Sequence, residues 1–331
     1  MMRAIAIDRF GGREVLEARE VEVPALQPGE ARVRVEYAGV NYIDVYMRTG
    51  AYARSDTYKT PLPMVLGMEG AGTVEAVGDG VEGLAPGQRV AWCIVRGAYA
   101  EFAAVPAWRL VPVPDAVPLD VACALMLQGS TAHYLTHSAW QIRAGDVCVV
   151  HAGAGGVGQL LIQLAKLRGA MVIATVGTPE KAAIARARGA DHTILYRSMD
   201  FRDEVRRITN GRGADVVYDS VGRDTVHRSI RSLRRRGLCV MFGASSGQVE
   251  AIAPLELAEA GSVFFTRPHL ADYMQDAAEI RGRAQDLFEA FAGGKLQVTI
   301  DRVFALAEVA DAHRVLEGRE SRGKLLLATM G

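Results

Sequence analysis

Six short apolar runs alternate with amphipathic segments in the middle of the chain, between residues 146 and 268. The runs read "DVCVVHAG", "AMVIATVG", "DHTILY", "ADVVYDSVG", "LCVMFG" and "SVFFTRP". Strands that alternate with helices form a parallel sheet, because each crossover between parallel strands needs a connection about as long as a helix. We therefore predict an α/β protein in which this region is a doubly wound domain with a six-stranded parallel sheet.

Helix start and stop signals support this prediction. "GVGQLLIQLAKLRG" is predicted to be a helix that is ended by Gly169. "TPEKAAIARARG" is predicted to be a second helix, with Thr178 as its N-cap, Pro179 at its first position and Gly189 past its end. "DTVHRSIRSLRRRG" is predicted to be a helix up to Gly237, with its arginines in the last turn, where they complement the helix dipole. We prefer this to a nucleic-acid surface, because no aromatic residues are interleaved with the arginines.

The flanking segments have a different residue pattern. Short β-like runs separated by Gly and Pro, such as "ARVRVEYAGV" and "AGTVEAVG", fill the first part and predict an antiparallel or barrel-like sheet. A chain of 331 residues is too long for one core of ordinary size. We predict a β domain made of residues 1–127 and 268–331, with the doubly wound domain, residues 128–267, inserted into it.

The charge balance and the spacing of the cysteines argue against several kinds of function. The 38 basic and 38 acidic residues give no overall attraction to nucleic acid or to an anionic membrane. The four cysteines are far apart, which excludes clustered disulfide frameworks and CxxC metal ribbons. We find no secretory signal or membrane-spanning run, so we expect a cytoplasmic protein with reduced thiols.

A glycine-rich loop, Gly153 to Gly158, fits the pattern GxGxxG and lies between a predicted strand and a predicted helix. Glycines allow the backbone to approach a phosphate closely, and the helix start offers N–H groups and a positive dipole end. We predict a dinucleotide site in which Gly155, Gly156 and Val157 contact the pyrophosphate. The alternative is a turn that only packs the helix on the strand.

The second predicted strand indicates which dinucleotide binds. An NAD site usually has Asp or Glu at the end of this strand, but none occurs between Met171 and Pro179. Gly177 leaves room there, and Lys181, Tyr196 and Arg197 offer the cations and hydroxyl that suit a 2′-phosphate. We therefore predict NADPH as the cofactor. The alternative is that Lys181 and Arg197 are solvated surface charges.

Further motifs cover nearly the whole chain, among them "GVNYIDVYMRTGAY", "LGMEGAGTVEAVGDGV", "HAGAGGVG", "VVYDSVG", "FGASSG" and "GKLLL". Together they resemble the zinc-free quinone oxidoreductase branch of the medium-chain dehydrogenase/reductase superfamily, which includes the zeta-crystallins. The resemblance implies a GroES-like β domain, a Rossmann domain and a nicotinamide held in the cleft between them. It also implies a homodimer.

Zinc-dependent members of the superfamily carry Cys where Asn41 stands and His where Met68 stands. Neither Asn nor Met is a credible zinc ligand, so we expect no metal. Alcohol oxidation needs a Lewis acid or a base to stabilise an alkoxide, whereas a quinone accepts a hydride readily. The predicted function is therefore NADPH-dependent, metal-free reduction of quinones or other electron-poor acceptors.

The resemblance implies three catalytic candidates. Asn41 lies where the amide could donate to a carbonyl oxygen of substrate or cofactor, and Tyr46 and Tyr52 lie where a phenol could stack on a quinone. Asn41 and Tyr46 are also candidate cofactor contacts. The alternatives are a turn-capping asparagine and ordinary packing of the tyrosines.

The other cofactor candidates follow from the family motifs or lie at carboxyl ends of parallel strands, where such sheets bind ligands. They are Thr131, Thr178, Ser220, Val221, Phe242, Gly243, Ala244, Ser245, Phe265, Thr266, Arg267 and Arg319. Tight-turn packing is the alternative at the strand ends.

Two other functions stay open. One is NADPH-dependent reduction of the double bond of an enone or enoyl thioester. The other is a crystallin-like protein that binds NADPH or RNA with little turnover, although the balanced charge argues against strong RNA binding.

Overall fold

The chain leaves its first unit after Ser130 and returns to it at Met274. The computed structural model describes residues 1–330, and in it Met1–Ser130 and the segment from Met274 onward form the first unit. Thr131–Tyr273 form the second unit. These boundaries lie close to the predicted ones at 127/128 and 267/268.

A six-stranded sheet in which every strand runs parallel forms the centre of the second unit, as predicted. Its order is β11-β10-β9-β12-β13-β14, so the chain winds outward from β9 in one direction and then from β12 in the other. Ligands bind such sheets at the point where the direction reverses. The strands are β9 (Val147–Val150), β10 (Met171–Val176), β11 (His192–Leu195), β12 (Ala214–Asp219), β13 (Leu233–Met241) and β14 (Phe264–Thr266).

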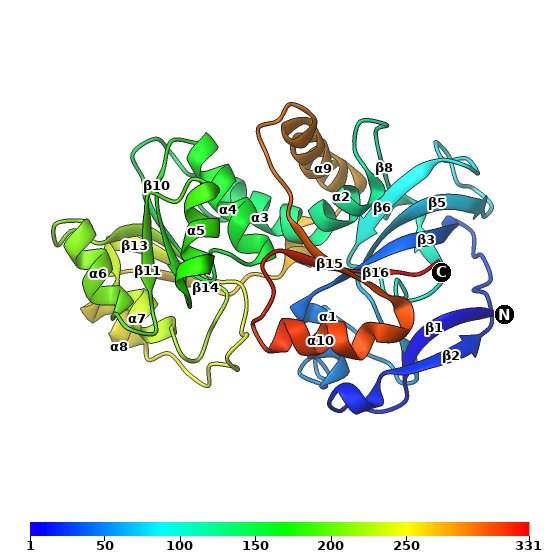
Figure 1. The fold of residues 1–331 in the computed structure, drawn as a ribbon, viewed down its shortest axis with the longest axis horizontal. Helices are drawn as coiled ribbons and strands as arrows, with labels where there is room; N and C mark the ends of the chain where they lie inside the picture. The colour runs from blue at the N-terminus through cyan, green and yellow to red at the C-terminus, as the bar shows by residue number, and fades with distance from the viewer. Residues whose placement is uncertain (331) are drawn as a thin grey trace. The chain divides into compact units, whose positions relative to one another are not determined.

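Helices cover both faces of this sheet. Figure 1 shows α4 (Gly156–Leu167) and α5 (Pro179–Ala187) on one side, with α6 (Phe201–Ile208), α7 (Val226–Arg231) and α8 (Pro254–Glu259) on the other. The unit begins in α3 (Ser130–Tyr134) and the π-helical turn η4 (Leu135–Ala139), and it ends in the short helix η5 (Leu270–Tyr273). The predicted N-cap of α5 is confirmed, because Thr178 Oγ1 accepts a hydrogen bond from the Lys181 N–H at 3.3 Å.

The prediction of a helix up to Gly237 was wrong. Helix α7 ends at Arg231, and β13 begins at Leu233, so the next three arginines lie in a strand. Two long-range interactions override the helical pattern: Leu233 pairs with Ala214 on β12, and Arg234 Nε donates to Asp215 Oδ1 at 2.5 Å. The register between β12 and β13 shifts in this stretch, which accommodates the positive φ of Arg236.

The first unit contains a seven-stranded sheet that is mostly antiparallel, as the punctuated β-like runs predicted. Its strands are β3 (Glu30–Val40), β5 (Glu69–Val77), β6 (Arg89–Cys93), β7 (Phe102–Pro106), β8 (Val111–Pro112), β15 (Ile300–Ala305) and β16 (Lys324–Ala328). Among the described strand pairs of this sheet, β15–β16 is parallel and the others are antiparallel. A second sheet has the order β2-β1-β4, from β1 (Met2–Ile7), β2 (Glu17–Val21) and β4 (Met64–Val65).

The helices of the first unit are short apart from α9. They are α1 (Tyr42–Arg48), α2 (Leu119–Ala124), α9 (Ala277–Ala292) and α10 (Val309–Glu317), with the turns η1 (Arg13–Val15), η2 (Ala107–Arg109), η3 (Leu125–Gly129) and η6 (Leu306–Glu308). No helix in residues 1–330 has the length and apolar character needed to cross a membrane.

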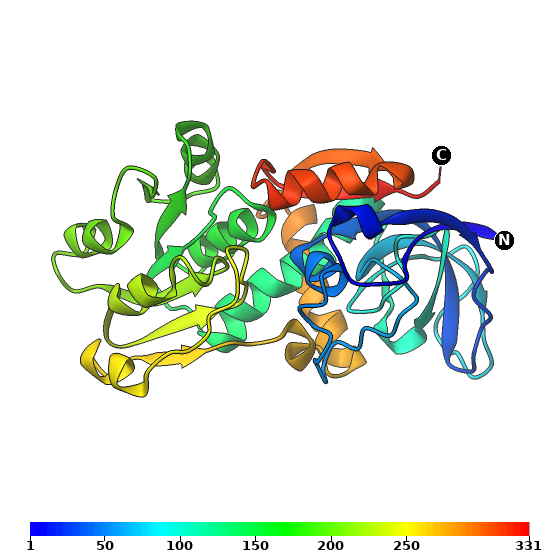
Figure 2. The same ribbon diagram turned by 90° about the horizontal axis from the view of Figure 1, so that it is seen from below.

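The C-terminal segment completes the first unit. Strand β16 pairs with β3 in the register Leu325 to Val40, and Figure 2 shows α10 beside the N-terminal segment that contains η1. This pairing brings Lys324, at the start of β16, next to Asn41, which directly follows β3. The two ends of the chain therefore build one site together.

Asp215 of β12 provides a test of this packing. Its carboxylate is 2% exposed and accepts hydrogen bonds from the Val147 N–H and from Arg212 and Arg234. Burial acts to raise the pKa of Asp215, but the Val147 N–H and the two arginines hold it below its ordinary value. We expect Asp215→Ala to lower the free energy of unfolding by about 3 kcal/mol at pH 7, measured by urea denaturation.

A carboxylate with a lowered pKa stabilises the fold above its unfolded pKa of about 4, and this contribution is lost as the pH falls. The difference between Asp215→Ala and the unsubstituted protein should therefore shrink toward pH 3. As a control, Arg207→Ala removes an exposed ion pair with Glu204 and should change stability by about 0.5 kcal/mol or less. Equal effects of the two substitutions would contradict this account.

Candidate functional site

The glycine-rich loop of the second unit is packed too tightly for side chains. A Cβ atom on Gly153 would lie 2.7 Å from Ala174 Cβ, and one on Gly158 would lie 2.9 Å from Gly153 Cα. Gly155 is the N-cap of α4, and residues 156 and 157 form the first turn of that helix. First-turn N–H groups have no partner within the helix, and they lie at its positive end. The loop therefore fits a pyrophosphate, and the predicted contacts Gly155, Gly156 and Val157 lie on it.

The end of β10 fits the 2′-phosphate of NADPH. A Cβ atom on Gly177 would lie 3.0 Å from Tyr196 Oη and 3.4 Å from Arg197 Nε, so this glycine leaves room for the hydroxyl and the guanidinium beside it. Thr178 follows and caps α5, whose first turn contains Lys181. Hydroxyl, guanidinium and ammonium groups are the donors that a phosphate prefers.

Backbone hydrogen bonds connect the residues that follow β12 to those that follow β13. The Ser245 N–H donates to Ser220 O at 3.2 Å, the Ser246 N–H donates to Val221 O at 2.9 Å, and a Cβ on Gly243 would lie 2.7 Å from Ser220 O. The predicted cofactor residues Ser220 and Val221 thus lie beside the predicted group Phe242, Gly243, Ala244 and Ser245. Of the other candidates in this unit, Phe265 and Thr266 lie in β14, Arg267 follows β14, and Thr131 lies in α3.

In the first unit, Asn41 is the N-cap of α1 and is almost fully buried. Its side-chain Nδ2 donates to Glu69 Oε2 at 2.8 Å and to Gly39 O at 3.2 Å, while Oδ1 accepts from Lys324 Nζ at 2.8 Å. Both amide hydrogens are therefore used inside the unit. Donation from Asn41 to a substrate carbonyl stays a prediction, and it requires one of these two bonds to be exchanged.

Glu69 and Lys324 form a buried ion pair beside Asn41, with side-chain exposures of 0% and 1%. Glu69 Oε1 also accepts a hydrogen bond from the Leu127 N–H at 2.5 Å. A buried charge is costly unless it is paired and hydrogen-bonded, and here the carboxylate has an ammonium and two N–H donors. Within residues 1–330 no cluster of three or more His, Cys, Asp or Glu could hold a metal ion.

Asp44 fixes the backbone on both sides of this pair. Its carboxylate accepts hydrogen bonds from the Asn41 N–H at 2.9 Å, the Met68 N–H at 3.1 Å and the Tyr99 hydroxyl at 3.1 Å. Burial raises the pKa of Asp44 to about 7, and the hydrogen bonds from Asn41 and Tyr99 oppose that rise. Asp44 therefore holds the backbone at positions 41 and 68, where zinc-dependent members of the superfamily carry metal ligands.

Tyr99 is oriented in turn by His313. Arg48 has only donors, so His313 Nδ1 accepts from Arg48 Nη1 at 2.9 Å, and the ring proton must lie on Nε2, which faces Tyr99 Oη at 3.3 Å. Arg48 is buried and also pairs with Glu317 at 2.8 Å. A directional series of hydrogen bonds thus runs from Arg48 to Asp44.

Four tyrosines form an aromatic row on α1 and the loop after it. The ring centroids of Tyr46 and Tyr52 are 5.4 Å apart with their planes nearly perpendicular, and Tyr42 and Tyr58 extend the row at 6.0 and 5.1 Å. The two tyrosines predicted to be catalytic are therefore brought together. Arg319 follows α10 with a positive φ, and its charge acts on Tyr42, whose pKa burial raises.

The sequence reasoning missed several buried polar residues. Asp44 could have been found, because Asn41 and Asp44 have the spacing of a capping box. Lys324 was part of a recognised motif but had no assigned role. His151 and Asp219 also lie in quoted motifs, "HAGAGGVG" and "VVYDSVG", but had no assigned role. No local signal marks the others, which are Tyr99 and His313 in the first unit and Thr175 and Ser229 in the second.

Comparisons with known proteins identify the family. Residues 27–115 match the family model "Alcohol dehydrogenase GroES-like domain", and residues 156–290 match "Zinc-binding dehydrogenase". A quinone oxidoreductase of Pseudomonas aeruginosa is 40% identical over 328 residues, covering 99% of both chains. The chain belongs to the quinone oxidoreductase family.

Other members of the family are similar over their full length. A 2-haloacrylate reductase of a Burkholderia species is 40% identical over 336 residues, covering 99% of both chains. The structure of Escherichia coli quinone oxidoreductase complexed with NADPH has a TM-score of 0.95 at 37% identity, covering 98% of this chain and 99% of that one. The resemblance inferred from the motifs is confirmed.

We expect His313 to make the stability of this family member sensitive to acid. Burial, reinforced by the charge of Arg48, lowers the pKa of His313 to about 3. An unfolded histidine takes up its proton near pH 6.5, so the contribution to stability is complete above that pH and is lost as the pH falls toward 3. We expect the free energy of unfolding to fall by about 1.4 kcal/mol per pH unit from this group between pH 6 and pH 4.

Urea denaturation of the unsubstituted protein and of His313→Gln at several pH values measures this contribution. Gln retains a donor and an acceptor but does not titrate, so its curve should lack that part of the slope. The interpretation is wrong if both proteins show the same pH dependence.

Proposed function

We propose that this protein reduces quinones with NADPH, by transfer of a hydride and without a metal. The observation that carries the proposal is the arrangement at the end of β10, where Gly177 lies beside Tyr196 and Arg197 and no Asp or Glu occurs between Met171 and Pro179. It occurs in a chain 40% identical to a quinone oxidoreductase and similar to a structure determined with NADPH.

The residues of this chain bind the cofactor and orient the acceptor. The loop at Gly155–Val157 holds the pyrophosphate, Lys181 and Tyr196 hold the 2′-phosphate, and the joined ends of β12 and β13 shape the other side of the dinucleotide site. NADPH, when bound, supplies a hydride. Tyr46 and Tyr52 stack on the flat acceptor, and a hydroxyl that donates to a quinone oxygen favours the charge that develops there. The aromatic hydroquinone anion then takes a proton from solvent.

A second candidate function is reduction of an electron-poor carbon–carbon double bond. The observation in its favour is the 2-haloacrylate reductase that is 40% identical over nearly the whole chain. The same donor could serve, since the hydride would then add to carbon and the proton to the neighbouring carbon.

We also propose that the protein is a cytoplasmic homodimer. Strand β14 is an edge of the six-stranded sheet, and Phe264 on it is 61% exposed. An edge strand with an exposed aromatic side chain is a suitable surface for pairing with a second copy.

Acceptor specificity distinguishes the two functions. Purified protein with NADPH should oxidise the cofactor in the presence of 1,4-benzoquinone or 9,10-phenanthrenequinone, measured by the loss of absorbance of NADPH. Parallel assays with an enal, an enoyl-CoA and 2-chloroacrylate test double-bond reduction. The quinone proposal fails if no quinone gives a rate above the nonenzymatic background, or if a double-bond acceptor has a far higher kcat/KM.

Cofactor preference tests the role of Lys181. We expect Lys181→Ala to raise the KM for NADPH about tenfold, because one charge-assisted contact to the 2′-phosphate is lost. The KM for NADH, which lacks that phosphate, should be nearly unchanged. Arg202→Ala, at an exposed position on α6, is the control and should affect neither cofactor. Equal losses with both cofactors after Lys181→Ala would contradict the assignment.

A further inference from the structure

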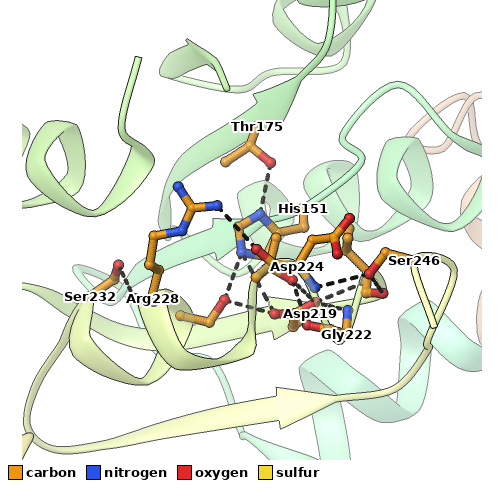
Figure 3. A network of polar contacts seen from close by, with 11 residues as sticks. His151, Thr175, Asp219, Gly222, Asp224, Arg228, Ser232 and Ser246 are labelled. Atoms are coloured by element: carbon orange, nitrogen blue, oxygen red, sulfur yellow. Dashed lines mark hydrogen bonds and ion pairs between the residues drawn. The ribbon is translucent and has the colours of Figure 1, made fainter. Parts of the chain in front are cut away.

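Four buried polar side chains connect the strand ends of the second unit. Thr175 of β10, His151 directly after β9, Ser229 of α7 and Asp219 at the end of β12 are each at most 2% exposed. Thr175 Oγ1 lies 2.8 Å from His151 Nδ1, His151 Nε2 lies 2.9 Å from Ser229 Oγ, and Ser229 Oγ lies 2.7 Å from Asp219 Oδ2. Figure 3 shows His151 between Thr175 and Asp219. We call this set of four residues the His151 bridge.

The protons of the His151 bridge can be assigned from its acceptor end. The Ser229 hydroxyl donates to the Asp219 carboxylate, which also accepts hydrogen bonds from the Val221 and Gly222 N–H groups and from the Thr225 hydroxyl. Ser229 Oγ then accepts from His151, which places the ring proton on Nε2. In the neutral ring Nδ1 is an acceptor, so Thr175 donates. Burial lowers the pKa of His151, which favours this neutral form although Asp219 opposes the shift.

The acidic end of the His151 bridge shapes the turn after β12. Asp219 Oδ1 accepts from the Val221 N–H at 2.8 Å, the Gly222 N–H at 2.9 Å and the Thr225 hydroxyl at 2.9 Å. Gly222 has a positive φ, and a Cβ there would lie 3.0 Å from Ala244 Cα, so this turn packs directly on the loop after β13. Asp219 therefore sets the position of the predicted cofactor residues at both strand ends.

The other end of the His151 bridge reaches the glycine-rich loop. The Thr175 carbonyl accepts from the Gly153 N–H at 3.1 Å, and the His151 N–H donates to the Tyr218 carbonyl at 3.1 Å. Two residues after Thr175, the chain reaches Gly177, where the 2′-phosphate is proposed to bind. One continuous series of hydrogen bonds thus links the three backbone segments that would contact the two halves of a dinucleotide.

Apolar packing alone would hold these strands together, so the hydrogen bonds of the His151 bridge are not needed for that purpose. Phe201 packs against the His151 ring at 4.7 Å, in an otherwise apolar cluster that includes Val149, Val217 and Ile230. Buried polar groups are costly unless every partner is present, and a complete set specifies one arrangement more sharply than apolar packing does. The His151 bridge is therefore suited to fixing geometry.

We propose that His151, Thr175, Ser229 and Asp219 are positioning residues that hold the three loops of the dinucleotide site in one binding-competent arrangement. This inference rests on the proposed use of NADPH. None of the four residues needs to touch the cofactor; they act through the backbone of Gly153, Val221 and Gly222.

Two serines, one in α7 and one at its C-cap, give a matched test. Ser229 and Ser232 are both fully buried and both donate at 2.7 Å, but Ser232 donates to the Arg228 carbonyl at the end of its own helix. We expect Ser229→Ala to raise the NADPH dissociation constant and the KM for NADPH about tenfold, with the KM for the quinone nearly unchanged. Ser232→Ala should change the affinity for NADPH by no more than about twofold.

Two substitutions at Thr175 distinguish a positioning role from an effect on stability. Thr175→Val keeps the shape of the side chain and removes the hydroxyl, whereas Thr175→Ser keeps the hydroxyl and removes a methyl group from the core. The NADPH dissociation constant, measured by fluorescence titration, should rise about tenfold in Thr175→Val and stay near that of the unsubstituted protein in Thr175→Ser. Urea denaturation of each variant shows whether affinity follows the hydroxyl or only the free energy of unfolding.

The outcomes separate the two proposals. If the unsubstituted protein does not bind NADPH, the proposed function fails. If it binds NADPH and the Ser229→Ala and Thr175→Val variants bind equally well, or if affinity only follows stability across all four variants, the positioning role is overturned.

Discussion

Carboxyl groups without access to water need a complete set of hydrogen-bond partners, and the candidate sites of both units are built around this constraint. Asp219 in the second unit accepts four hydrogen bonds, and Asp44 in the first unit accepts three. Most of these donors are backbone N–H groups or hydroxyls at strand and helix ends. The hydrogen bonds to these carboxylates therefore fix the surrounding loops. These loops contain the residues proposed to bind cofactor and substrate.

The first unit also shows how a member of this superfamily can stabilise its site without zinc ligands at positions 41 and 68. A positive charge beside Glu69 is supplied by Lys324, which is part of the chain and hydrogen-bonded to Asn41. The Asn41 amide, the Glu69 carboxylate and the Lys324 ammonium group are hydrogen-bonded to one another. The family model that matches residues 156–290 is named for zinc binding, but the residues at positions 41 and 68 lack zinc-binding chemistry.

Local patterns predicted the parts of the fold that depend on neighbouring residues. The strand–helix alternation correctly gave the six parallel strands, and Thr178 was recognised as an N-cap because its partner, Lys181, is three residues away. The arginine-rich stretch before Gly237 was misread as helix. Its conformation is set by Asp215 and by pairing with β12, and neither is visible in a local window.

The sequence by itself determined the family, the alternating topology and the position of the glycine-rich loop between a strand and a helix. Only the tertiary structure decided which polar groups meet. Lys324 and Asn41 are 283 residues apart, and His151 and Ser229 are 78 apart. Such partners carry no periodic signal, because strand pairing and crossover geometry rather than sequence spacing bring them within hydrogen-bond distance.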